Sequence, residues 1–263
     1  MINELINGGE LASINYIFLF LVGLFGAVIA NTTGAGGGII FIPFFSILMF
    51  KPSVAVATSI GIQCLGMTAG SIGWLFKLHN RINLIKIALT CSIYGALGSF
   101  VAHNVRYYID EYLGLLFGTL SLLVAYGSIC FFRRKNNTKI DVTFNFYLFI
   151  ASVIGGFFNY MVSIGIGELI LFASVMSGFC IKRSIALAVL TTSFTVISMF
   201  YLYKLYIVAS MAFVLPIGAG AIVGGSCASY IVEIVGAEKV KRFCTFIIGS
   251  TGLLEVVTWA YKI

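Results

Sequence analysis

Apolar runs of membrane-spanning length recur along nearly the whole chain, with only short polar gaps between them. A helix needs about 20 apolar residues to cross a hydrocarbon core of about 30 Å. Hydrophobic residues make up 60% of the 263 positions and charged residues 10%, and the mean hydropathy is +1.07. The runs are apolar on every face, whereas barrel strands alternate apolar and polar residues. The sequence therefore predicts an all-α polytopic membrane protein without a soluble domain.

Two of the predicted hydrophobic segments are too short to cross a bilayer unaided. Segments 38–50 and 169–181 would reach only about 20 Å as helices. Each follows a glycine-rich interruption, NTTGAGGG at 31–38 and SIGIGE at 163–168. The sequence therefore predicts short, broken helices at two places. All the segments together are 14–33, 38–50, 54–76, 84–102, 113–132, 146–164, 169–181, 184–203, 206–232 and 243–261.

The two interruptions are related by a constant shift of 131 residues, and five pairs of identical residues share it. Matches at one offset, placed around equivalent short segments, are the signature of an internal repeat. We therefore expect residues 1–135 to form a first transmembrane repeat and residues 136–263 a second. The matching pairs are Gly34 and Gly165, Gly36 and Gly167, Lys51 and Lys182, Ala55 and Ala186, and Ala57 and Ala188.

The distribution of basic residues distinguishes two topologies. If each short segment crosses or dips so that it counts as a pass, each half has five passes, and 12 of the 16 basic residues share the side of Arg133. If the short segments only continue the spans before them, the division is 9 against 7. The positive-inside rule favours the first topology, in which the odd number of passes inverts one repeat relative to the other, as in many secondary transporters. The four basic residues then on the opposite side are Lys51, Arg106, Lys204 and Lys262.

Irregular backbone at membrane depth must face protein or a water-filled cavity, because lipid cannot satisfy its N–H and C=O groups. Glycine permits the tight turn, and the first N–H groups of the helix that follows present a partial positive charge. The two breaks therefore predict a substrate site for an anion near the membrane midplane. The alternative is that the glycines only allow close helix packing. That alternative is stronger for Gly23 and Gly26 than for the consecutive glycines of GAGGG.

The polar and glycine residues around the two breaks are the candidates for binding the substrate. Bare amides and hydroxyl groups can donate hydrogen bonds to an oxyanion, and we expect Gly37 to adopt a positive φ angle. The hydroxyl groups can equally bond to their own helix, and the sequence does not decide between the two roles. The candidates are Asn31, Thr32, Thr33, Gly34, Gly36, Gly37, Gly38, Thr58, Ser59, Gln63, Ser163, Gly165, Gly167, Thr191 and Thr192.

Glu168 is the only acidic residue that this segmentation places well inside the apolar region. An ionisable residue at membrane depth is by default a functional hypothesis. Burial without a cationic partner favours the neutral acid, which could bind an anion and later release its proton on the other side. Glu168 is therefore the candidate for proton coupling. The alternative is that its side chain caps backbone amides at the start of segment 169–181.

The other titratable residues predict no site. Glu255 lies about one turn before Trp259 and is expected to reach the membrane interface. His79 and His103 form no metal-ligand spacing with the six cysteines, which we interpret as small apolar residues, so no metal and no cofactor is expected. The cysteines are Cys64, Cys91, Cys130, Cys180, Cys227 and Cys244.

Several function classes are excluded or disfavoured. An ATP-driven pump would need a GxxxxGK[ST] motif and a nucleotide-binding domain, and the chain has neither. An enzyme would need a nucleophile and base, or metal ligands, at depth, and a single isolated carboxylate supplies no such set. The basic pI near 9.1 is explained by cytoplasmic loops, so no nucleic-acid partner is expected.

The two motifs resemble those of the sulfite exporter TauE/SafE family, also called the TSUP permeases. The first motif is GAGGGIIFIP, followed by Pro52 and AVATSI, and a degenerate second copy is GIGELILFA, followed by Lys182 and ALAVLTTS. The resemblance implies a permease for sulfite, sulfonates or related organic anions in the cell inner (plasma) membrane. In the second copy Glu168 replaces a motif glycine and Ser174 replaces the motif proline. The residues that match are Gly34, Gly36, Gly37, Gly38 and Pro43 in the first copy and Gly165 and Gly167 in the second.

The sequence as a whole predicts a secondary transporter of a small anion that works by alternating access. Its expected partners are the anionic substrate and the lipid bilayer. The alternative is a non-transporting assembly factor or scaffold in the membrane. Transport by the purified protein in liposomes distinguishes the two.

Overall fold

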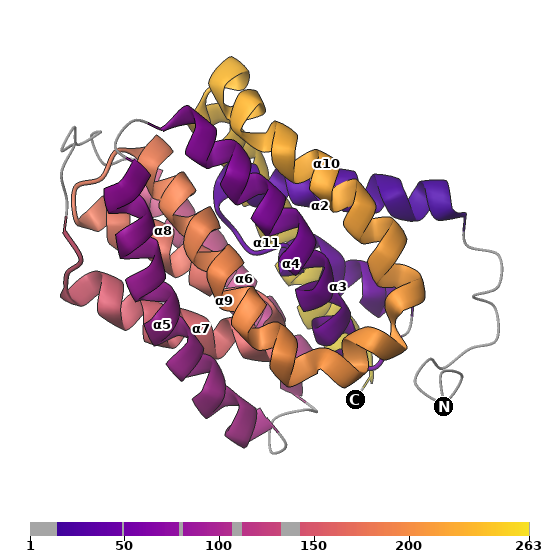
Figure 1. The fold of residues 1–263 in the computed structure, drawn as a ribbon. Helices are drawn as coiled ribbons and strands as arrows, with labels where there is room; N and C mark the ends of the chain where they lie inside the picture. The colour runs from indigo at the N-terminus through magenta and orange to yellow at the C-terminus, as the bar shows by residue number, and fades with distance from the viewer. Residues whose placement is uncertain (1–14, 49, 79–80, 107–111, 133–142, 263) are drawn as a thin grey trace.

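The computed structural model describes residues 15–48, 50–78, 81–106, 112–132 and 143–262. This part of the chain forms ten α-helices, and each overlaps one of the predicted hydrophobic segments (Figure 1). The basic loop at Arg133, on which the topology prediction partly depends, lies outside the described residues. The helices are α2 (Tyr16–Thr33), α3 (Gly38–Ile47), α4 (Pro52–Lys77), α5 (Arg81–Val105), α6 (Leu113–Phe132), α7 (Phe146–Val162), α8 (Ile166–Met176), α9 (Ile181–Ala209), α10 (Met211–Val235) and α11 (Ala237–Lys262).

Six of the described helices, α2, α4, α5, α9, α10 and α11, are long and apolar enough to cross a membrane. The short helices α3 and α8 contain 10 and 11 residues and are too short to do so. The prediction of an all-α polytopic membrane protein is therefore confirmed, as is the prediction of two short helices after glycine-rich breaks.

Local sequence signals explain where several helices begin and end. The side chains of Asn15 and Asn145 accept hydrogen bonds from the first turns of α2 and α7, at 2.8 and 3.1 Å, as N-cap residues do. Pro52 occupies the first turn of α4, where its missing N–H costs nothing. Gly34 ends α2 in the left-handed conformation, with φ of 75°. Capping therefore places the first break immediately after Thr33.

Three helix termini meet at one end of the bundle, which we call the Glu233 end. Glu233 of α10 forms ion pairs with Lys77 at the end of α4 and with Lys182 at the start of α9, the latter at 3.0 Å. The Lys77 ammonium also lies 3.6 Å from the centre of the Tyr230 ring. Both lysines therefore lie at the same end of the bundle. In the alternative topology, in which the short segments only continue the spans before them, Lys77 and Lys182 would lie at opposite ends. The opposite end, where α5 finishes, we call the Arg106 end.

The pair α2 and α3 enters and returns at the Arg106 end. Along α2, Phe20 lies against Gly220 and Leu24 against Gly224, so α2 runs beside α10 toward the Glu233 end. After the break, α3 leads back to Pro52, where α4 begins its path to the Glu233 end. We call α2 and α3 together the first hairpin.

The pair α7 and α8 has the opposite orientation. Ser99 of α5 donates to the Gly156 carbonyl at 3.1 Å, and His103 lies 2.6 Å from the Tyr160 hydroxyl, so α7 runs beside α5 toward the Arg106 end. After its break, α8 leads back to Ile181 at the Glu233 end. We call α7 and α8 together the second hairpin.

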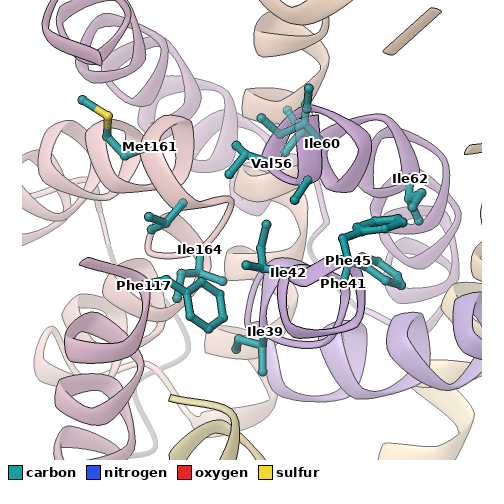
Figure 2. Packing of buried hydrophobic residues seen from close by; sticks show 14 of the residues in the cluster. Ile39, Phe41, Ile42, Phe45, Val56, Ile60, Ile62, Phe117, Met161 and Ile164 are labelled. Atoms are coloured by element: carbon teal, nitrogen blue, oxygen red, sulfur yellow. The ribbon is translucent and has the colours of Figure 1, made fainter. Parts of the chain in front are cut away.

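The two hairpins are held by a core built from both halves of the chain. Helix α2 packs on α10, α5 on α7, α4 on α9 and α6 on α11, so each of these pairs joins the halves. Glycines permit the closest approaches: a Cβ atom on Gly23 would overlap the Ile217 carbonyl oxygen, which agrees with the packing interpretation of that residue. Figure 2 shows apolar side chains of α3, α4 and α6 gathered beside Ile164 of the second break.

Candidate functional site

The first break, Gly34–Gly37, reverses the chain at one glycine. Gly34 has φ of 75°, a backbone conformation that residues with a side chain rarely adopt. Gly37 has φ of −63° and ψ of −15°, which are helical values, so the prediction of a positive φ at Gly37 is wrong. The reason is that Gly34 completes the reversal, and Gly37 is already the N-cap of α3. The glycines after Gly34 must therefore have another role.

The second break, Ser163–Gly165, is held by a hydrogen-bonded cluster. Ser163 has φ of 61° and Gly165 has φ of 124°. The Gln63 amide nitrogen donates to the Ser163 hydroxyl at 2.6 Å and lies 3.3 Å from the Ser163 carbonyl oxygen. The Ser163 hydroxyl donates to that of Ser59 at 2.9 Å. Residues of α4 thus hold a strained backbone conformation in the second hairpin.

The two breaks cross with their backbones in contact. A Cβ atom on Gly38 would overlap the Ser163 carbonyl oxygen, and one on Gly167 would overlap the Gly34 carbonyl oxygen. A Cβ atom on Gly36 would lie 3.0 Å from the Ser163 oxygen. Glycine is therefore required at Gly38 and Gly167, because the hairpins approach too closely there for a side chain, and Gly36 has little room for one.

The crossing lies near the middle of the bundle. Gln63 is about 17 Å along α4 from the Arg106 end, and Thr192 is about 17 Å along α9 from the Glu233 end, at about 1.5 Å per residue. Gln63 contacts the second break, and the Thr192 hydroxyl would lie 3.0 Å from a Cβ atom on Gly167. The breaks thus meet at similar depths from both ends, where α4 and α9 pack together (Figure 1).

Glu168 joins the two breaks. Its Oε1 accepts a hydrogen bond from the Gly36 amide at 3.2 Å, and its Oε2 accepts one from the Gly165 amide at 2.9 Å. The side chain is 2% exposed, and within the described residues no ion pair includes it. The second contact is the capping interaction weighed from the sequence. The first contact shows that the same carboxylate also occupies an amide of the other hairpin.

Most other hydroxyl groups among the candidates bond to their own helices. Thr58 donates to Val54 at 2.7 Å and Thr192 to Ala188 at 2.8 Å. Thr32 and Thr33 both donate to the Ile29 carbonyl, and Thr33 also accepts from the Ala35 amide at 3.2 Å. Of the alternatives left open for these side chains, the structure shows the intrahelical one.

Asn31 and Thr191 are buried but lie outside the cluster of Gln63, Ser163 and Ser59. The Asn31 amide donates to Ala27 at 2.9 Å and to Gly66 at 3.3 Å, and the Trp74 indole donates to the Asn31 carbonyl at 3.0 Å. Asn31 therefore attaches α2 to α4. Trp74 was not predicted from the sequence, where its only signal is a polar N–H on a large aromatic side chain within a membrane span.

A cavity of about 210 Å³ lies between the crossing and the Arg106 end. Glu255 lines it and is 4% exposed, so the prediction that this residue reaches the membrane interface is wrong. The reason is that α11 packs against α6, and residues of α6 line the same cavity as Glu255. The lining residues are Ile42, Ser46, Phe50, Pro52, Ala55, Val56, Leu113, Gly114, Phe117, Val162, Glu255, Thr258 and Trp259.

A cationic and aromatic cluster covers the second hairpin at the Arg106 end. The Arg106 guanidinium lies 5.0 Å from the Tyr203 ring centre and 5.7 Å from that of Tyr160. Arg106 Nη1 and the Tyr203 hydroxyl both donate to the Tyr160 carbonyl, at 3.4 and 2.8 Å. A cation there complements the partial negative charge at the end of α7. From the sequence, Arg106 contributes only to the prediction of topology.

Two broken hairpins that meet at mid-depth inside a bundle of apolar spanning helices define a polytopic protein of the membrane transporter class. Residues 19–254 match the family model for the sulfite exporter TauE/SafE, so the chain belongs to this family. Membership of the family, implied by the two glycine-rich motifs, is confirmed. No curated protein and no solved structure matches the chain.

Proposed function

We propose that this protein is a secondary transporter of a small anion, specifically a sulfur-containing oxyanion such as sulfite or a sulfonate, and that it works by alternating access. The observation that carries the proposal is the crossing of the two breaks. The amides of Gly36 and Gly165, one from each hairpin, converge on a single carboxylate group. Two amides that bind one carboxylate offer the donors that an oxyanion requires.

The arrangement of the hairpins supports a transporter built from inverted repeats. The first hairpin enters from the Arg106 end and the second from the Glu233 end. In the predicted repeat, α2 of the first half corresponds to α7 of the second, and α5 corresponds to α10. The packed pair α2 and α10 therefore has its counterpart in the packed pair α7 and α5. Movement of one hairpin relative to the other would expose the crossing first to one side of the membrane and then to the other.

The cavity supplies the access route on one side. Ile42, one turn beyond Gly38, and Val162, next to Ser163, both line it. In this proposal the cavity is the vestibule of a plasma-membrane transporter, and it leads from the non-cytoplasmic face to the crossing.

Reconstitution tests transport directly. The purified protein in liposomes should take up radiolabelled sulfite or methanesulfonate faster than protein-free liposomes and faster than liposomes containing an unrelated membrane protein. Unlabelled substrate inside the vesicles should accelerate uptake by exchange. A folded protein that transports none of a panel of sulfite, sulfonates, sulfate and small carboxylates, but retains a partner complex in pull-down experiments, would support a scaffold.

We expect the Arg106 end to be external. On a cysteine-free background, Arg106→Cys and Lys204→Cys should react with a membrane-impermeant maleimide in intact cells. Lys239→Cys should react only after permeabilisation, because the Glu233 end carries most of the basic residues. Labelling of Arg106→Cys only after permeabilisation would reverse the proposed orientation.

We expect Ser46→Trp to reduce uptake to less than roughly a tenth of the wild-type rate, because the indole would fill the vestibule. Ile47→Trp is the matched control: Ile47 is the next residue of α3, its side chain is 70% exposed, and it does not line the cavity. This variant should transport at near the wild-type rate. Equal rates for the two variants would show that substrate does not pass through the cavity.

A further inference from the structure

Glu168 occupies the donor groups that the proposed function assigns to the substrate. Its two oxygens accept hydrogen bonds from the amides of Gly36 and Gly165, as the oxygens of an oxyanion would. Both glycines are buried, so a second anion cannot reach these amides while the carboxylate remains. Two negative charges at one site of low dielectric would also repel strongly. A substrate anion can therefore bind there only if the carboxylate leaves or loses its charge.

In the part of the chain that the structure describes, no cation is paired with Glu168 to compensate for a second negative charge. Helix α8 packs against α7 and α9, and the first break contains no titratable residue. Within the described residues, no hydrogen bond or ion pair joins Glu168 to another titratable side chain. The titratable residues on the two packed helices are Tyr147 and Tyr160 on α7 and Lys182, Arg183, Tyr201, Tyr203, Lys204 and Tyr206 on α9.

An independent observation identifies a partner for the neutral acid. The Gln63 side chain is 1% exposed, and its orientation is determined because Nε2 lies 3.3 Å from the Ser163 carbonyl, which can only accept. Gln63 Oε1 has no donor within the described part of the chain. It faces Gly36, at 3.4 Å from the position of a Cβ atom there. A buried acceptor beside the Glu168 site is costly unless it receives a hydrogen bond.

We propose that Glu168 is a tethered competitor of the substrate: its carboxylate occupies the amides of Gly36 and Gly165, and an entering oxyanion displaces it as a neutral acid that donates to Gln63 Oε1. One proton joins the carboxylate as one anionic charge arrives, so the net charge of the site is unchanged. This inference rests on the proposed anion site. It adds a reason why anion binding must be coupled to protonation of Glu168: the amides of Gly36 and Gly165 cannot bind the substrate and the carboxylate at the same time.

The test measures anion binding against pH in the full-length protein in nanodiscs. The probe is methanesulfonate, which remains a monoanion over the range examined, so any pH dependence belongs to the protein. Wild-type affinity should rise about tenfold for each unit of decreasing pH while Glu168 is ionised in the free protein, because binding takes up one proton. Glu168→Gln should bind with nearly constant affinity. Glu238→Gln, which alters an exposed carboxylate in the first turn of α11, should keep the wild-type slope.

A second measurement uses the unaltered protein. Infrared difference spectra should show a neutral carboxylic acid band when methanesulfonate is added, and Glu168→Gln should lack it. A wild-type slope in Glu168→Gln, or no new acid band in the wild type despite binding, would overturn the competition while leaving the anion site intact. If wild type and Glu168→Gln, both folded, bind neither methanesulfonate nor sulfite at any pH, the proposed anion site itself fails.

Discussion

Gly167→Ala is expected to abolish transport and to destabilise the protein by about 3 kcal/mol or more. The added methyl group would overlap the Gly34 carbonyl oxygen, which belongs to the backbone of the other hairpin. Because no side-chain rotation can relieve this overlap, the hairpins would have to separate. Thermal unfolding in detergent, followed by size-exclusion chromatography, measures the loss of stability, and liposome uptake measures the loss of transport.

Two further alanine variants test whether the contact between the two hairpins is the cause of the lost stability and transport. Gly249→Ala on α11 would place a methyl group 3.6 Å from Ala125, an ordinary contact, and should leave stability and transport close to wild type. Gly37→Ala should have an intermediate effect, because its Cβ atom would meet the side chains of Phe41 and Gln63, which can shift. A Gly167→Ala protein as stable and active as Gly249→Ala would show that the hairpins do not cross as described.

Glu168→Gln is expected to retain exchange of substrate but to lose accumulation driven by a pH gradient. A carrier that moves one proton with each monovalent anion concentrates the anion about tenfold for each unit of pH difference, since one unit is worth about 1.4 kcal/mol. Glutamine keeps the shape of the side chain and can still accept from one amide, but it carries no proton. The measurement is uptake into liposomes with and without an imposed pH difference, beside counterflow at equal pH.

Glu238→Gln serves as the comparison for this experiment, because Glu238 is exposed in the first turn of α11 and lies neither at the crossing nor along the cavity. It should still accumulate substrate when a pH gradient is imposed. Accumulation by Glu168→Gln with the wild-type pH dependence would remove Glu168 from the coupling mechanism.

The helices and their breaks could be predicted because the signals are local. Apolar length marks each helix, and the consecutive glycines Gly36, Gly37 and Gly38 destabilise a continuous helix. The charge bias indicated that the short segments count as passes, and the ion pairs of Lys77 and Lys182 with one carboxylate agree with that count.

The contacts within the candidate site could not be predicted, because they depend on how distant segments meet. Nothing near Gly36 in the sequence indicates that its amide binds a carboxylate 132 positions later. The burial of Glu255 depends on the packing of α11 on α6, whereas the sequence gives only its distance from the aromatic residues at the end of α11. Thr58 and Thr192 bond to their own helices because that acceptor is always within reach in an apolar surrounding.

Only one of the two hairpins supplies the carboxylate at the crossing. The shift of 131 residues aligns Glu168 with Gly37, so only the second hairpin carries an acid at this position. If α7 and α8 move as a unit, the acid travels with the hairpin that opens toward the Glu233 end, while the other hairpin moves without one. Reversing the gradients would then not simply retrace the forward cycle at equal rates. Import and export rates measured at matched driving force should therefore differ.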